Sequence, residues 1–129
     1  MRQSWWKILS IVLLLYCFIG GLLVPLPNRI AYEDSNLYES MRNFFFHVPM
    51  WFSQLAMISV SLVYSIKYLR HPDLHNDIYA AEFARTGTVL GCLGLITGAI
   101  WANYTWGTYW NNDPKQIGAA IALLIYVAY

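Results

Sequence analysis

Two tryptophans, a tyrosine and a carboxylate stand close together in a short polar connection, WGTYWNNDPK, which runs from Trp106 to Lys115 between two apolar stretches. Clustered rings provide a flat apolar surface, and the glycine that follows Trp106 allows a close turn of the backbone. Two partners suit such a surface: the headgroup layer of a membrane, where Trp and Tyr are enriched, and the face of a planar cofactor. The segment leaves the choice between them open.

The end of this segment has the pattern of a helix start. Asp113 is predicted to be the N-cap, Pro114 the first helical residue, and Gln116 the second partner of a capping box. Capping explains the carboxylate without any ligand. It leaves the cluster of aromatic side chains unexplained.

A second candidate is His47, which lies in the sequence FFFHVPMW. Pro49 suits a first helical turn, so His47 is expected at or just before the N-terminus of a helix. The positive end of the helix dipole would favour neutral imidazole there, which is the form that binds metals. A hydrogen-bonding histidine at a membrane boundary is the alternative interpretation.

The elements that carry these residues are apolar. Of the 129 residues 58% are hydrophobic and 12% are charged, which is typical of a membrane protein. Three apolar runs of spanning length are expected over residues 5–24, 44–68 and 83–103, and a fourth begins near residue 117. The sequence therefore predicts an all-α, polytopic membrane helix bundle with four spans in a single domain over residues 1–129.

The first and last apolar runs each allow an interpretation other than a complete membrane span. A signal peptide is the rival interpretation of the first, but no small-residue cleavage site follows it, and Val24-Pro25-Leu26-Pro27 is expected to stop the helix. Residues 117–129 would make only roughly 20 Å of helix against a hydrocarbon core of about 30 Å. We expect an incomplete fourth span and a sequence that continues in a longer protein.

Gly87, Gly91, Gly94 and Gly98 lie on one face of the third run, where they are expected to let another helix approach closely. Cys17 and Cys92 fall within spans and lack a haem-attachment signature, so we interpret them as small apolar residues.

The distribution of Lys and Arg predicts the orientation. Five cations flank one side and three the other, which places the N-terminus in the cytoplasm: Arg2, Lys7, Lys67, Arg70 and Arg85 against Arg29, Arg42 and Lys115. The connection over residues 104–116 is then an outward-facing, tryptophan-rich loop. In either orientation, His47 and this loop open onto the same side of the membrane.

An aromatic shelf and an imidazole on one side of a membrane suit a porphyrin, whose iron takes an axial histidine. Arg29, Arg42 or Lys115 could pair with the haem propionates.

His47-Val-Pro49 followed by the Trp106 to Lys115 segment resembles the haem-handling superfamily with the tryptophan-rich "WWD" domain. Over essentially the whole chain it looks most like the C component of the cytochrome c maturation system, the haem exporter protein C family. The resemblance implies a protein of six spans in the bacterial inner membrane, with non-covalent haem b held at its periplasmic face. The haem is handed to a periplasmic chaperone, the E component, beside ABC-transporter subunits and a small membrane subunit.

The resemblance also implies the site. His47 would be an axial ligand of the iron, and the remaining site residues would be those of the tryptophan segment: Trp106, Gly107, Tyr109, Trp110, Asp113 and Lys115. A second axial histidine is expected beyond residue 129. The sequence departs from the usual motif in two places, because Asn112 replaces a further tryptophan and Lys115 replaces an arginine, whose bidentate fork lysine lacks.

Other functions are less well supported by the sequence. His71 and His75 have i, i+4 spacing but lack the glutamate of a zinc protease motif, and neither a phosphate-binding glycine loop nor a basic run for nucleic acid is present. No activated nucleophile or acid–base pair indicates an enzyme, so we expect a haem-presenting protein. Two alternatives stay open: the cytochrome c synthase of the other maturation system, and a structural subunit of a transporter complex.

Overall fold

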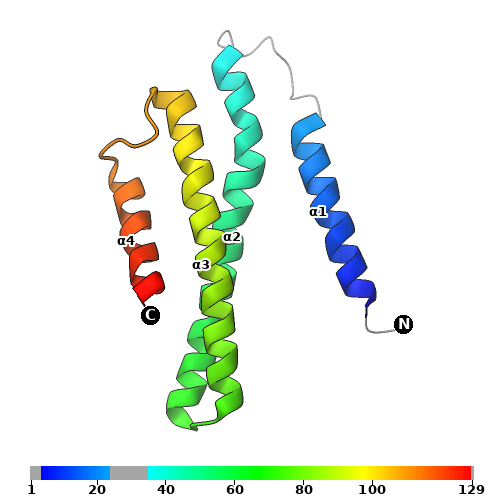
Figure 1. Cartoon of the computed structure of the whole chain (residues 1–129), viewed down its shortest axis with the longest axis vertical. Coiled ribbons are helices and arrows are strands. Elements are labelled where there is room, and N and C mark those ends of the chain that lie inside the picture. Colours follow the sequence, from blue (N-terminus) through cyan, green and yellow to red (C-terminus); the bar gives the residue numbers. More distant parts are fainter. Residues whose placement is uncertain (1–3, 24–34, 129) are drawn as a thin grey trace.

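The computed structural model describes residues 4–23 and 35–128, and the side chains of these residues except those of 35–41. Within these residues four helices follow one another: α1 (Trp5–Leu23), α2 (Ser35–Arg70), α3 (Leu74–Trp106) and α4 (Pro114–Ala128). Figure 1 shows α2 and α3 as a long antiparallel hairpin, with α1 beside α2 and the short α4 beside α3. The all-α bundle predicted from the sequence is confirmed.

Three of the helices are long and apolar enough to cross a membrane. They are α1, the part of α2 from Arg42 to Arg70, and α3, and they correspond to the first three predicted spans. Their large apolar side chains face outward, as in α1, where every described residue but Gly20 and Gly21 is exposed. Such a surface needs lipid or other helices around it, so the chain is a membrane protein. The expected stop at residues 24–27 lies outside the described residues.

Helix α2 corrects the expected position of His47. The helix begins at Ser35, so His47 and Pro49 lie in its interior rather than at its N-terminus. Pro49 has no N–H to donate to the carbonyl of Phe45, but α2 continues through it as one helix. The helix dipole does not set the protonation of His47, which lies about three turns from the helix start and beyond the reach of the terminal charge.

The packing of α3 on α2 depends on small residues, as the sequence predicts. Gly87, Gly91 and Gly94 are buried, and a Cβ on any of them would meet side chains of α2 at 3.0 Å or less. Further along, the Ser61 hydroxyl donates to the carbonyl of Ala80 at 2.8 Å. Close approach of the two backbones therefore sets the register of the hairpin.

Helix α3 is longer than the predicted span at both ends. Asp73 caps its N-terminus by accepting a hydrogen bond from the backbone N–H of His75, and Gly107 ends it in a left-handed conformation with φ of 76°. Trp106 is thus the last residue of α3. The predicted loop 104–116 includes the last turn of α3 and the first turn of α4, and the connection between the helices is residues 107–113.

The start of α4 confirms one part of the capping prediction and corrects another. Asp113 Oδ1 accepts a hydrogen bond from the backbone N–H of Lys115 at 2.7 Å, and Pro114 is the first helical residue. Gln116 does not complete a capping box. Its side chain accepts from the backbone N–H of Asn111 and donates to the carbonyl of Tyr109, so it stabilises the connection instead of the N-cap.

Helix α1 is held to α2 at one end. The Arg42 guanidinium donates to the carbonyl of Leu22 at 2.7 Å, in the last turn of α1. Nearby, the Phe18 and Phe46 rings make an edge contact, and Phe46 packs against Gly21. Arg42 therefore donates to carbonyl groups at the end of α1, where the last carbonyls have no partner within the helix.

Candidate functional site

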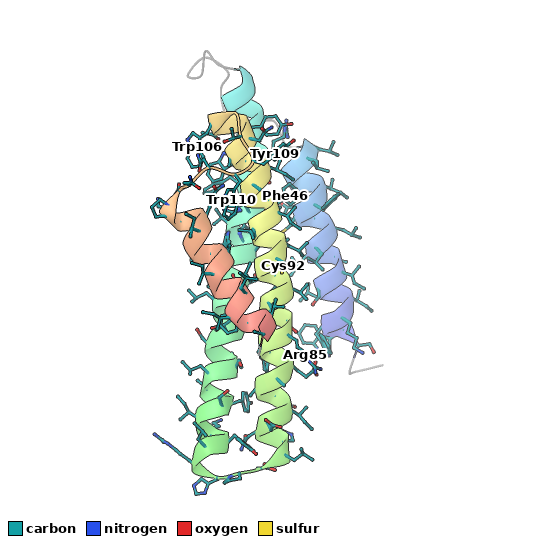
Figure 2. The ribbon with its side chains drawn as sticks, turned by 60° about the vertical axis from the view of Figure 1, so that its left-hand side comes forward. Phe46, Arg85, Cys92, Trp106, Tyr109 and Trp110 are labelled. Atoms are coloured by element: carbon teal, nitrogen blue, oxygen red, sulfur yellow. The ribbon has the colours of Figure 1, made fainter. Side chains whose placement is uncertain are left out.

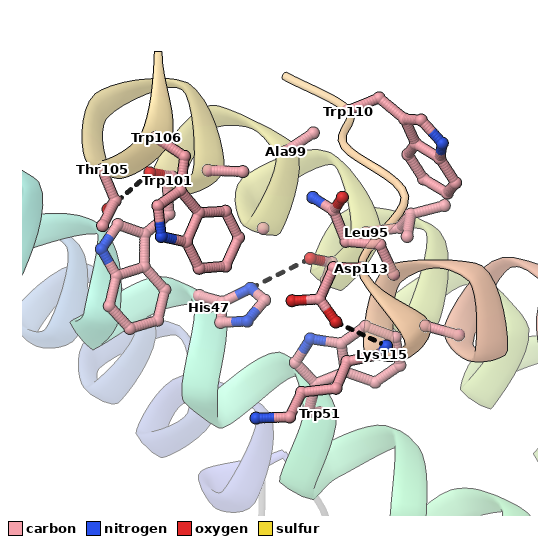
Figure 3. A pocket seen from close by; sticks show the side chains of 15 residues that line it. His47, Trp51, Leu95, Ala99, Trp101, Thr105, Trp106, Trp110, Asp113 and Lys115 are labelled. Carbon is pink, nitrogen blue, oxygen red and sulfur yellow. Dashed lines mark hydrogen bonds between the residues drawn. The ribbon is translucent and has the colours of Figure 1, made fainter. Parts of the chain in front are cut away.

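A cavity of about 560 Å³ opens between α2, α3 and the start of α4. Its size falls within the range of small-molecule and cofactor sites, about 300–1,000 Å³. Four tryptophans line it together with a histidine and two charged residues: Trp51, Trp101, Trp106, Trp110, His47, Asp113 and Lys115. In Figure 3 the imidazole of His47 lies between the indoles of Trp51 and Trp101, and Asp113 and Lys115 stand on the α4 side.

The imidazole of His47 is fixed on the backbone of α3. Its Nδ1 lies 3.0 Å from the carbonyl oxygen of Gly94 and 3.2 Å from Oγ1 of Thr97. The Gly94 carbonyl can only accept, so Nδ1 carries the proton and donates. In neutral imidazole the lone pair is then on Nε2.

This arrangement is the one that metal-ligating histidines use. Such a histidine donates its other ring N–H to a carbonyl or carboxylate, which fixes the tautomer and the direction of the ligating nitrogen. His47 meets that condition through Gly94. The interior of α2 and the facing glycine stripe, rather than a helix terminus, therefore fix the tautomer and the direction of this imidazole.

Trp51 and Trp101, which are not among the residues proposed for the site, also line the cavity. The ring centroids of His47 and Trp101 are 5.7 Å apart, those of His47 and Trp51 are 6.1 Å apart, and both pairs meet edge to face. A sequence signal existed for Trp51, which lies one helical turn after His47. Trp101 could be found only from the packing of α3 against α2.

The structure brings together five of the seven residues proposed for the site. His47, Trp106, Trp110, Asp113 and Lys115 line the cavity, which confirms that the histidine and the tryptophan segment lie at the same end of the bundle. Gly107 and Tyr109 do not line it. Gly107 ends α3, and Tyr109 is exposed with its carbonyl bound to Gln116. Figure 2 shows Trp106, Tyr109 and Trp110 at this end, well away from Arg85.

The structure distinguishes the three cations proposed to pair with the haem propionates. Lys115 lines the cavity. Arg42 is engaged with the carbonyls of Gly21 and Leu22 and is not among the lining residues. Arg29 lies outside the described residues.

The other histidines and the two cysteines lie away from the cavity. His71 is at the turn between α2 and α3, and the ring of His75 contacts Tyr79 with centroids 4.5 Å apart. Cys17 and Cys92 are free thiols on exposed helix faces. Among the described residues, no group of three or more His, Cys, Asp and Glu side chains could hold a metal ion by itself.

Comparison with known proteins gives a family for the chain. The model of the family described as Cytochrome C assembly protein matches residues 2–129. Several curated relatives are named cytochrome c biogenesis protein CcsA. The one from Pelargonium hortorum is 31% identical over 140 residues, which cover 98% of this chain and 44% of the relative.

Two further relatives carry the same name. The protein of Ranunculus macranthus is 28% identical over 137 residues, with 98% of this chain and 43% of the relative covered. That of Prochlorococcus marinus strain MIT 9301 is 46% identical over 68 residues, with 53% and 21% covered. The chain spans less than half the length of these relatives. No solved structure gives a significant match.

The family match extends over nearly the whole chain, and the relatives share one name. Both findings agree with the resemblance that His47 and the tryptophan segment carry. The chain belongs to the cytochrome c assembly family, and the relatives that it matches are named for cytochrome c biogenesis.

Proposed function

We propose that the protein containing this chain binds haem b non-covalently in the cavity between α2, α3 and α4 and presents it for cytochrome c maturation. One observation carries the proposal. The Nδ1–H of His47 is bound to the carbonyl of Gly94, so the lone pair of Nε2 is available in a cavity lined by four tryptophans.

The residues of the cavity fit haem better than a bare metal ion. Among the described residues, His47 is the only histidine that lines the cavity, and a single imidazole with one carboxylate is too small a ligand set for an isolated ion. Haem supplies an iron whose four equatorial nitrogens come with the cofactor, so that the protein has only to provide axial ligands. The indole rings offer apolar faces to the macrocycle.

Each lining residue has a distinct role in this proposal. His47 ligates the iron through Nε2, and Trp51, Trp101, Trp106 and Trp110 exclude water and contact the ring. Lys115 offers an ammonium group to a propionate, as a point charge rather than a bidentate partner. Asp113 holds the first turn of α4, and with it Lys115, in place.

The proposal places the haem at the outer face of a bacterial inner membrane, with the N-terminus of the chain in the cytoplasm. Trp106 and Trp110 are about half exposed at the rim of the cavity, so a partner could reach the haem edge there. The receiver is the periplasmic haem chaperone, the E component, in a complex with ABC-transporter subunits and a small membrane subunit.

A second route uses the same site and passes the haem within a cytochrome c synthase of the other maturation system. The names of the relatives describe cytochrome c biogenesis and do not say which protein receives the haem. A photoreactive residue placed at position 110, in place of Trp110, distinguishes the two routes by the proteins that it crosslinks in cells. Crosslinks to a soluble haem chaperone support the first, and crosslinks to an apocytochrome c or a synthase subunit replace it with the second.

The test of haem binding uses the complete gene product, purified in detergent from cells that make haem. We expect a Soret band in the wild type and loss of most of it in His47→Gly, with recovery when imidazole is added to fill the vacated ligand position. His75→Gly is the matched control, because His75 lies on α3 far from the cavity. A Soret band that is unchanged in His47→Gly would remove His47 from the site.

A further inference from the structure

We infer that Thr97 is a positioning residue for His47: its hydroxyl oxygen shares the Nδ1 proton with the Gly94 carbonyl and so controls how strongly the imidazole donates to a metal. This inference rests on the proposed function, since it concerns the ligand strength of His47. It assigns a role to a side chain of α3 outside the tryptophan segment.

The hydroxyl oxygen of Thr97 can act only as an acceptor toward His47, because its proton is used within α3. The hydroxyl is a donor toward its own helix, with Oγ1 lying 2.9 Å from the carbonyl of Leu93 and 3.1 Å from that of Gly94. Its one proton is therefore used within α3, and its lone pairs are free to accept. Nδ1 of His47 lies 3.2 Å from this hydroxyl oxygen.

A second contact fixes Thr97 against the same face of α2. Asn43 Nδ2 donates to the backbone carbonyl of Thr97 at 2.5 Å. Asn43 and His47 are four residues apart, so they lie one above the other on α2, and both bind the same turn of α3. The position of the Thr97 hydroxyl relative to the imidazole is therefore set from both helices.

The chemical consequence follows from the direction of the hydrogen bonds. Two acceptors on Nδ1–H draw its proton away from the ring and increase the basicity of Nε2. A more basic axial imidazole stabilises ferric iron relative to ferrous iron, which lowers the reduction potential. Removal of one acceptor should weaken haem binding and raise the potential.

Thr97→Val tests this, because valine has the shape of threonine without the acceptor. We expect about tenfold weaker haem binding, the lower end of the effect of losing an outer-shell partner of a ligand, and a more positive midpoint potential of the bound iron. Thr97→Ser keeps the hydroxyl and should restore both values. Thr97→Ala removes both the hydroxyl and the γ-methyl group, and it should shift the potential in the same direction as Thr97→Val.

The matched control is Thr88→Val. Thr88 also lies on α3 and donates to the carbonyl four residues earlier, at 2.8 Å from Ala84, but it is not among the residues that line the cavity beside His47. The midpoint potential of the bound iron and the haem affinity of Thr88→Val should equal those of the wild type. A shift in this variant would show that loss of a threonine back-bond, and not the contact with His47, is responsible, and would overturn the inference.

The remaining outcomes are separable. Equal potentials in Thr97→Val and the wild type, next to a His47→Gly variant that loses its Soret band, overturn the role of Thr97 and leave the proposed function standing. A His47→Gly variant that keeps its Soret band refutes the assigned ligand, and the role of Thr97 with it. Equal shifts in Thr97→Val and Thr97→Ser contradict the assignment to the hydroxyl.

Discussion

Gly98 of α3 faces the imidazole of His47 so closely that a Cβ added to it would stand 2.7 Å from Cε1 and 3.3 Å from Nδ1 of the ring. Real Cβ atoms do not approach other heavy atoms to less than 3.0 Å, so the ring could not keep its place beside a larger residue. The absence of a side chain at Gly98 is what allows His47 to reach the Gly94 carbonyl.

Gly98→Ala should therefore displace the imidazole and weaken haem binding by about tenfold or more, because the Nδ1 hydrogen bond is lost. Alanine favours the helix by about 1 kcal/mol over glycine, so secondary structure should be retained. Haem titration followed at the Soret band measures the effect. Gly118→Ala is the control, since nothing lies within 4 Å of a Cβ there, and a Gly98→Ala variant with wild-type affinity would contradict the prediction.

Trp106→Ala and Trp110→Ala distinguish a haem site from a scaffold. An aromatic contact is worth about 0.5–1.5 kcal/mol beyond its buried area, so each variant should bind haem roughly 2- to 13-fold more weakly. Haem content per assembled complex is the measurement, and Trp6→Ala, on the exposed face of α1, is the control. Loss of assembly with unchanged haem per complex would support the structural role instead.

Asp113 is expected to act through the helix rather than through its charge. Asp113→Ala should destabilise the protein by about 1 kcal/mol, the usual effect of losing an N-cap, as measured by thermal unfolding in detergent. Asp113→Asn keeps an acceptor for the Lys115 N–H and should preserve both stability and haem affinity. If Asp113→Asn lost haem as severely as Asp113→Ala, the carboxylate would have a direct role at the site.

Gly91 of α3 lies where α2, α3 and α4 pack together, so a substitution there tests this packing. A Cβ at this position would lie 2.5 Å from Gln54 Nε2 of α2 and 2.5 Å from Leu123 Cδ2 of α4. Gly91→Ala should therefore cost about 1–3 kcal/mol of unfolding free energy through overpacking. The second substitution Gln54→Ala removes one of the two neighbours and should recover part of the loss. A single variant as stable as Gly118→Ala would contradict this packing.

Much of the fold could be predicted from composition and periodicity. The apolar runs predict the spans, and the glycine spacing on α3 predicts the face on which another helix packs closely, because lipid exposure and close backbone approach each require particular residue types. The start of α4 followed from local capping chemistry at Asp113 and Pro114. The start of α2 did not, because the proline that marks helix starts also occurs inside helices that continue through it, as Pro49 shows.

The sequence by itself determined the membrane helices and the residues that could bind a cofactor. These are His47 and the tryptophan segment, which lie on the same side of the membrane and carry the motif of a cytochrome c assembly protein. Only the tertiary structure decided which tryptophans surround His47 and which acceptors hold its Nδ1. Gly94 is 47 residues from His47 along the chain, and Trp101 is further still. Contacts over such separations depend on the register of α2 against α3, which the buried glycines set through packing and which no local pattern contains.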